Sequence, residues 1–285
     1  MLMQRVLTAI VLLLVLLGAL TANGPWPLII LLLVLAGCAL WGWLRLSMSE
    51  TWKLSAPWLA VFSTLVMFWL VWTWMPSTAA VPAAAQMVHP WLMPLVALLW
   101  AILAVPQVLI GQTDKRRFAF ALSAFGVLAV VAAWAALVLI FVKFGAWCLV
   151  SMMALIWFAD IAAYFTGRAL GKHKLAPKVS PGKTWEGAIG GVLAAAVWTV
   201  ATAKIPGSYG AVLAQSWSLP MVFMLAAGLG VISIIGDLFE SLLKRRAGVK
   251  DSSNLLPGHG GVYDRIDALL PVAPVALMLT GIVFQ

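Results

Sequence analysis

Four polar residues in the C-terminal half of the chain share one face of a predicted helix. They recur every three or four residues in a segment otherwise rich in Leu, Ile and Phe: Asp237, Glu240, Ser241 and Lys244. A ladder of ion pairs at the helix end is the plain alternative, because Glu240 and Lys244 have the favourable i,i+4 order. That alternative does not explain Asp237, one turn deeper, which we take as a candidate metal ligand.

A glycine-rich segment follows this helix, and two acids follow the segment. Residues 257–261 read Pro-Gly-His-Gly-Gly, and glycines let the backbone approach a ligand and present N–H groups to phosphate. The surrounding cations favour a polyphosphate cradle over a plain turn: Lys244, Arg245, Lys250 and Arg265. His259 either donates to a phosphate or holds the loop. Asp264 and Asp267 share a helical face, as site acids or as simple capping acids.

A second basic loop, 168–186, contains two prolines and a Gly-Lys-Thr sequence at 182–184. This sequence resembles the end of a P-loop, but the first glycine of that motif falls at Pro177 and we expect no flanking strand. Ser180 and Lys183, beside the Pro-Gly turn, are placed to contact a phosphate. Loop charge and anionic lipid headgroups, at about 1 kcal/mol for each cation, explain the loop's first lysines.

Asp160 lies near the middle of an apolar run, with Tyr164 one turn further on. A carboxylate at that depth costs roughly 2.5–3.5 kcal/mol on insertion scales, so it is expected to have a polar neighbour. Two interpretations remain open. The side chain either faces a polar cavity or bonds to a neighbouring helix for packing alone.

Acids at membrane depth beside cations at the surface indicate a metal site that faces a phosphate site. The chain has no cluster of Cys and His, which excludes a typical zinc site. Oxygen ligands favour Mg²⁺, which binds a few carboxylates together with substrate phosphates. Asp237 and Asp264 are the first choices for its ligands.

Membrane-spanning helices must position these residues, because 64% of the 285 residues are hydrophobic and only 9% are charged. The fold class is therefore all-α, a polytopic integral membrane protein. About nine spans of roughly 20 residues are predicted. They cover 6–22, 27–44, 57–75, 91–111, 118–142, 147–167, 187–203, 219–242 and 267–284. We do not expect cleavage of the first span as a signal peptide, because it is long and lacks a good cleavage site.

The basic residues predict the orientation of these spans. Of the 18 Lys and Arg residues, 16 fall on one side. That side comprises the N-terminus, 45–56, 112–117, 168–186 and 243–266. The positive-inside rule therefore places the N-terminus in the cytoplasm. Because the charges lie in short clusters between apolar runs, they indicate topology rather than binding to nucleic acid.

The two parts of the chain differ in chemistry. Residues 151–285 contain seven of the nine acids and the long basic loops 168–186 and 243–266. We therefore interpret residues 1–150 as an N-terminal transmembrane scaffold and residues 151–285 as the catalytic region.

The segment from Ser241 to Asp267 closely resembles the signature of phosphatidate cytidylyltransferases, also called CDP-diglyceride synthases. It reads Ser241-Leu-Leu-Lys-Arg-Arg-Ala-Gly-Val-Lys-Asp-Ser-Ser-Asn-Leu-Leu-Pro-Gly-His-Gly-Gly-Val-Tyr-Asp-Arg-Ile-Asp267. Residues 171–187 are also similar to the bacterial members, whereas residues 1–150 match only as generic apolar sequence. After Asp160 this chain has Ile-Ala where bacterial relatives often show Ser-Gly.

The resemblance implies cytidylyl transfer from CTP to phosphatidate, giving CDP-diacylglycerol and pyrophosphate in phospholipid biosynthesis. It also implies Mg²⁺, with K⁺ at the same site, a homodimer, and a multi-pass protein of the bacterial inner membrane whose active site opens to the cytoplasm. The expected catalytic residues are Asp237, Lys244, Arg245, Asp264 and Asp267, with Asp237 and Asp264 as metal ligands. The expected substrate-binding residues are Asp160, Ser180, Lys183, Ser241, Lys250, Asp251, His259, Gly260 and Arg265.

Two rival functions share part of this pattern. A CTP-dependent polyprenol or phytol kinase would transfer the γ-phosphoryl group to an alcohol, and the long signature argues against it. A cation-coupled transporter would explain Asp160 and Asp237 as intramembrane acids. It leaves the basic glycine-rich loop unexplained.

Overall fold

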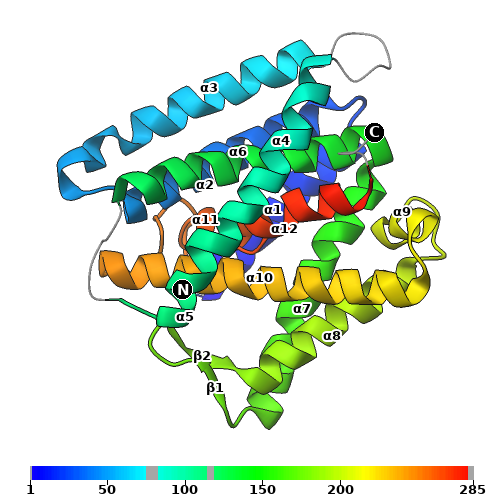
Figure 1. Cartoon of the computed structure of the whole chain (residues 1–285). Coiled ribbons are helices and arrows are strands. Elements are labelled where there is room, and N and C mark those ends of the chain that lie inside the picture. Colours follow the sequence, from blue (N-terminus) through cyan, green and yellow to red (C-terminus); the bar gives the residue numbers. More distant parts are fainter. Residues whose placement is uncertain (1, 75–82, 114–118, 282–285) are drawn as a thin grey trace.

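Helices make up nearly all of the computed structural model, which describes residues 2–74, 83–113 and 119–281 (Figure 1). The longer helices are α1 (Leu2–Thr21), α2 (Trp26–Ser47), α3 (Ala56–Trp74), α4 (Ala83–Leu99), α6 (Ala119–Phe144), α7 (Ala146–Leu170), α8 (Trp185–Thr202) and α10 (Leu219–Ala247). The shorter ones are α5 (Val105–Ile110), α9 (Tyr209–Ser216), α11 (Tyr263–Ile266) and α12 (Leu269–Leu279). A 3₁₀ turn covers Glu50–Ser55, and a π-helical turn, Trp100–Ala104, joins α4 to α5.

Seven described helices are long and apolar enough to cross a membrane. This confirms an all-α polytopic membrane protein, while the count of nine spans stays a prediction. The seven segments are Trp26–Ser47, Glu50–Thr73, Pro90–Ile110, Ala119–Phe144, Ala146–Leu170, Trp185–Thr202 and Leu219–Ala247. The first predicted span corresponds to α1, in which Ile10–Thr21 is the apolar part.

The last predicted span, 267–284, is shorter in the structure than expected. Helix α12 has 11 residues and contains Pro274, and most of its side chains are buried. At 1.5 Å per residue it rises roughly 16 Å, about half the hydrocarbon core of a bilayer. Residues 282–284 of this predicted span lie outside the described residues, as do residue 75 of the third, residue 118 of the fifth and the basic run 115–117.

A short β-hairpin lies inside the loop 168–186, where we expected no strand. Strand β1 (Lys174–Ala176) pairs antiparallel with β2 (Ser180–Thr184), so the expectation of no flanking strand was wrong. Lys183 nevertheless lies within a strand rather than in a loop after one, and residue 177 is a proline. The segment is therefore still not a P-loop.

An aromatic cluster joins the two parts of the chain. The Trp43 ring of α2 lies 5.5 Å from the Phe239 ring of α10 and 5.2 Å from the Tyr263 ring of α11. Trp100 and Phe125 complete the cluster, with ring centroids 5.2 Å apart. All five side chains are buried. Since Phe239 precedes Glu240 and Tyr263 precedes Asp264, packing in this cluster fixes the backbone that presents two site acids.

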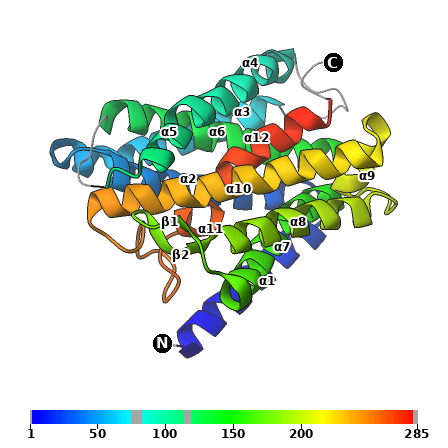
Figure 2. The ribbon, with the colours of Figure 1, turned by 60° about the horizontal axis from the view of Figure 1, so that its bottom comes forward.

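Helices α7 and α8 pack at short range through glycines, as the Gly- and Ala-rich composition of 187–203 predicted. A Cβ atom on Gly187 would lie 2.8 Å from the carbonyl oxygen of Ala163, and one on Gly191 would lie 2.7 Å from that of Ala159. Larger residues would push the helices apart. The two helices and α10 lie side by side, with the hairpin at one end (Figures 1 and 2).

The predicted cytoplasmic segments meet at the same end of the molecule. Arg246, at the end of α10, donates to the backbone oxygen of Gln112, and Thr8 of α1 donates to the backbone oxygen of Pro257. The hairpin and the glycine-rich loop also lie at this end (Figure 2). The structure thus brings together the segments that the charge pattern grouped on one side, and which side of the membrane they face stays a prediction.

Candidate active site

A cavity of about 500 Å³ lies between α7, α8, α10 and the hairpin. Its polar lining includes four of the predicted site residues: Asp160, Ser180, Lys183 and Asp237. Small residues of α7 and α8, such as Ala159, Ala163 and Gly191, form much of the remaining wall. Asp160 therefore faces a polar cavity, which is the first of the two interpretations left open by its sequence.

The cavity contains an ion pair between two elements that are far apart in the sequence. Lys183 Nζ of β2 lies 2.5 Å from Asp237 Oδ2 of α10. The side chains are 26% and 34% exposed, so both are accessible from the cavity. This contact places a cation and a carboxylate where a charged ligand would bind.

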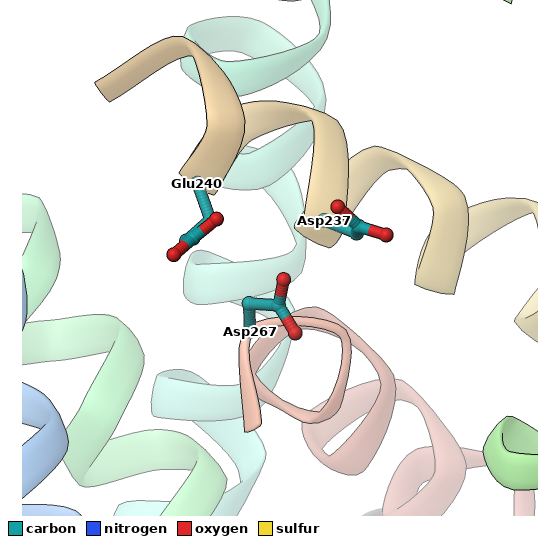
Figure 3. Close-up of side chains that lie close together, drawn as sticks. All are labelled: Asp237, Glu240 and Asp267. Atoms are coloured by element: carbon teal, nitrogen blue, oxygen red, sulfur yellow. The ribbon is translucent and has the colours of Figure 1, made fainter. Parts of the chain in front are cut away.

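Three carboxylates meet beside this pair. Asp237 and Glu240 project from α10, and Asp267 comes from the turn that leads into α12 (Figure 3). One oxygen of each lies within 4.8 Å of the others. Glu240 is 1% exposed, and its Oε1 has no hydrogen-bond partner within the described part of the chain. A buried, unpaired carboxylate oxygen facing two more acids fits the donor set of a hard cation.

Lys244 links this acidic group to Asp264. Its Nζ lies 2.6 Å from Glu240 Oε2 and 2.9 Å from Asp264 Oδ1. The i,i+4 ion pair considered for Glu240 is therefore present. It does not account for the second Glu240 oxygen, which stays free toward the acids.

Asp264 is surrounded by donors. Its Oδ2 accepts from the backbone N–H groups of Ser252, at 2.9 Å, and Gly261, at 2.7 Å, and from the Ser252 hydroxyl at 2.7 Å. Burial alone would raise the pKa of Asp264, but hydrogen bonds with Glu240, Lys244 and Ser252 outweigh it and hold that pKa below its usual value. The side chain is 8% exposed. Asp264 thus organises the glycine-rich loop, and its predicted metal binding stays a prediction.

The glycine-rich loop uses part of its backbone on itself. The N–H of His259 donates to the carbonyl of Leu256, and the carbonyl of Gly260 accepts from Leu256 at 2.8 Å. Gly260 has φ +82°, which favours glycine, and a Cβ there would lie 3.2 Å from Asp264 Oδ2. Arg265 donates to the carbonyl of His259 through Nε and Nη2. Of the two roles left open for His259, its backbone performs the second, holding the loop.

A profile of the cytidylyltransferase family matches residues 3–283. The chain belongs to the cytidylyltransferase family. A phosphatidate cytidylyltransferase of Pseudomonas aeruginosa is 38% identical over 288 aligned residues, which cover 96% of this chain and 95% of that protein. One of Brucella suis is 48% identical over 141 residues, and one of Haemophilus influenzae is 48% identical over 130.

The coverage differs among these cytidylyltransferases. The Brucella suis alignment spans 50% of this chain and 49% of that relative, and the Haemophilus influenzae alignment spans 46% and 44%. The chain thus matches about half the length of these two relatives and nearly all of the Pseudomonas aeruginosa protein.

The three consecutive cations at the end of α10 have different contacts in this member of the family. Lys244 faces the acids, whereas Arg245 Nε donates to the carbonyl of Val179 in the hairpin at 3.3 Å. Arg246 donates to the Gln107 side chain at 2.5 Å. Two of the three cations therefore join α10 to neighbouring elements, a division that consecutive basic residues do not reveal.

The other predicted site residues lie near this centre with fewer contacts. Ser241 is partly buried on α10, next to Glu240. Lys250 and Asp251 are exposed on the segment that follows α10. A Cβ on Gly260 would lie 3.1 Å from Asp251 Oδ1, so Asp251 borders the glycine-rich loop.

Sequence analysis missed two features of the site. It treated Glu240 as a partner of Lys244, whereas Glu240 also belongs to the acidic group. It gave no role to Glu186, which binds His173 at the base of the hairpin. The i,i+3 spacing of Asp237 and Glu240 was a usable signal for the first feature. No local pattern indicates the second.

Proposed function

We propose that the protein transfers the cytidylyl group of CTP to phosphatidate, giving CDP-diacylglycerol and pyrophosphate. The observation that carries this proposal is the cavity between three membrane helices, lined by Lys183, Asp160 and Asp237, in a chain of the cytidylyltransferase family. The Pseudomonas aeruginosa relative, similar over 96% of this chain, is a phosphatidate cytidylyltransferase. A lipid substrate explains why the polar residues lie between apolar helices.

The lining of the cavity divides into two parts that suit the two parts of a phospholipid. Ser180, Lys183 and Thr184 offer polar atoms from the hairpin and the start of α8. Ala163 and Gly191 offer an apolar wall between α7 and α8. Phosphatidate would place its phosphate near Lys183 and its glycerol and acyl chains along the small residues.

The acids of the site fit a bound cation. Asp237, Glu240 and Asp267 would hold Mg²⁺, with K⁺ nearby, because they supply oxygen atoms alone. When bound, the cation would neutralise the phosphates of CTP and the charge that develops on the leaving pyrophosphate. Asp264 was the second predicted ligand, and a change in its hydrogen bonds would be needed for it to reach a metal.

The residues of the chain would act mainly by positioning. The phosphate monoester of phosphatidate, with a second pKa near 6 by analogy with phosphorylated side chains, is largely dianionic at neutral pH and needs no general base. The difficulty is to bring one anion up to another. Lys183 would orient the lipid phosphate for in-line attack on the α-phosphorus of CTP, and Lys244 would offset charge on the nucleotide. Arg245 and Arg265 would act through the hairpin and the glycine-rich loop that they brace.

The cellular setting is proposed on the same basis. The bacterial relatives and the apolar helices support a multi-pass protein of the inner membrane. The concentration of cations at the end that carries the site supports an active site open to the cytoplasm. We also propose a homodimer, as the family resemblance implies.

Release of pyrophosphate by the purified protein in detergent tests the proposal. The assay contains CTP, Mg²⁺ and phosphatidate, and each is omitted in turn. Release that requires all three, with formation of CDP-diacylglycerol, is the expected result. Formation of CDP and a lipid phosphate from a lipid alcohol would instead identify a kinase. Absence of turnover with every lipid would overturn an enzymatic role.

A further inference from the structure

We propose that Glu186 is a positioning residue, which acts through His173 to hold the β1–β2 hairpin and thereby Lys183 at the cavity. This inference rests on the proposed function for its catalytic consequence. Its structural part, the attachment of the hairpin, stands on contacts alone.

The hairpin needs outside support. Strand β1 has three residues and β2 has five, with pairing at Lys174–Thr184 and Ala176–Ser180 and an irregularity between them. An isolated two-stranded hairpin is marginally stable at best in water. Pro181 has no N–H to donate, which weakens this one further. The position of Lys183 therefore depends on what holds the hairpin.

Glu186 closes the base of the hairpin. Its two carboxylate oxygens accept from the backbone N–H of His173, each at 3.3 Å, and Oε1 lies 2.7 Å from His173 Nδ1. Because a carboxylate only accepts, Nδ1 is the donor in this contact. The N–H of Trp185 also donates to the carbonyl of His173, at 2.9 Å. Residue 173 is thus bound on both sides of its peptide plane.

The remaining contacts of the hairpin lie at its turn. Val179 is buried, and its carbonyl accepts from Arg245 Nε at 3.3 Å. The hairpin therefore has one attachment at the turn, to α10, and one at the base, to the start of α8. Lys183 lies between the two and reaches Asp237. Loss of the base attachment would leave the strand that carries Lys183 supported at one end.

Glu186 acts on the site from outside the cavity. Among the described residues that line the cavity, neither Glu186 nor His173 is present. Its effect on the reaction must therefore pass through the hairpin. A purely structural role in α8 would lower stability without a specific link to Lys183, and the two roles can be separated by measurement.

A double-mutant cycle with the full-length protein in detergent tests the link. The variants are Glu186→Gln, Lys183→Met and the combination, and the quantity is kcat/KM for CTP from pyrophosphate release. Glu186→Gln is expected to lower it by roughly tenfold alone and by less than about twofold in the Lys183→Met background. Equal factors in the two backgrounds would overturn the proposal. Glu50→Gln, the same change in the exposed Glu50–Lys53 pair, is the matched control and is expected to have no effect.

Hydrogen exchange of the same proteins gives a readout that does not depend on activity. Glu186→Gln is expected to speed exchange of the amides in 174–184 and to leave those of α12 unchanged. Unchanged exchange in the hairpin would overturn the proposal even if activity fell. An inactive wild-type protein with faster hairpin exchange in the variant would overturn the proposed function and support the attachment by Glu186.

Discussion

The hairpin and the glycine-rich loop have similar sequences and opposite arrangements. Both contain a Pro-Gly pair and cations, and we predicted phosphate contacts for both. In the hairpin, the contacts lie at the base and the turn, which leaves Lys183 directed at the cavity. In the loop at 251–264, the N–H groups of Ser252 and Gly261 point inward to Asp264.

The difference teaches that an acid inside a loop decides where its donors point. Asp264 collects backbone and side-chain donors that would otherwise be available to an anion. Glu186 has the corresponding role for the hairpin but binds at its base, away from Lys183. The hairpin therefore presents a cation, whereas the loop presents a folded surface stabilised by a carboxylate.

Replacement of Asp237 should give the largest effect and would break the comparison if it did not. Asp237→Asn is expected to lower the rate of pyrophosphate release at least about 100-fold, because it removes a carboxylate at the reacting end of the cavity. The unfolding temperature should stay near that of the wild type, since Asp237 is one-third exposed. A rate within threefold of the wild type would remove Asp237 from the site.

Replacement of Asp264 should affect both activity and stability. Asp264→Ala leaves Lys244, Ser252 and Gly261 without their acceptor, which is expected to cost about 2–4 kcal/mol of unfolding free energy and to abolish most activity. Thermal unfolding in detergent, compared with Asp237→Asn, separates the two acids. Wild-type stability would contradict the loop-organising role, and full activity would exclude Asp264 from the site.

Lys183 and Lys143 offer a matched pair of cations. Lys183→Met is expected to lower kcat/KM for CTP by roughly 10- to 100-fold, because the lipid phosphate and CTP would meet without that charge. Lys143, exposed at the end of α6, lies on the predicted opposite side of the membrane. Lys143→Met should leave the rate unchanged. Equal losses in both variants would show a general effect of net charge rather than a contact in the cavity.

Two glycines sharpen the comparison at the smallest scale. A Cβ on Gly261 would lie 2.2 Å from Ser252 Oγ and 2.6 Å from Ser253 Oγ, whereas one on Gly182 meets no atom within 4 Å. Gly261→Ala is therefore expected to cost about 1–3 kcal/mol of unfolding free energy, and Gly182→Ala about zero. Thermal unfolding of both variants measures this difference. An equal shift in the two would mean that the loop at 251–264 is not tightly packed.

The long helices could be predicted because runs of apolar residues have few alternatives in a membrane. The stripe of Asp237, Glu240 and Lys244 could also be predicted, since i,i+3 and i,i+4 spacing defines a helix face regardless of tertiary contacts. The hairpin could not be predicted, because its strands are short and contain prolines. The attachment of Glu186 joins residues of two different elements and has no local signature.

The sequence by itself determined the all-α membrane class, the one-sided clustering of cations and the residue types of the site, because hydropathy and charge act locally along the chain. Only the tertiary structure decided that Lys183 pairs with Asp237, that Glu240 and Asp267 face it, and that Asp264 is enclosed by its own loop. These pairings depend on how α7, α8 and α10 pack, and that packing follows from small residues whose contacts are not visible in sequence.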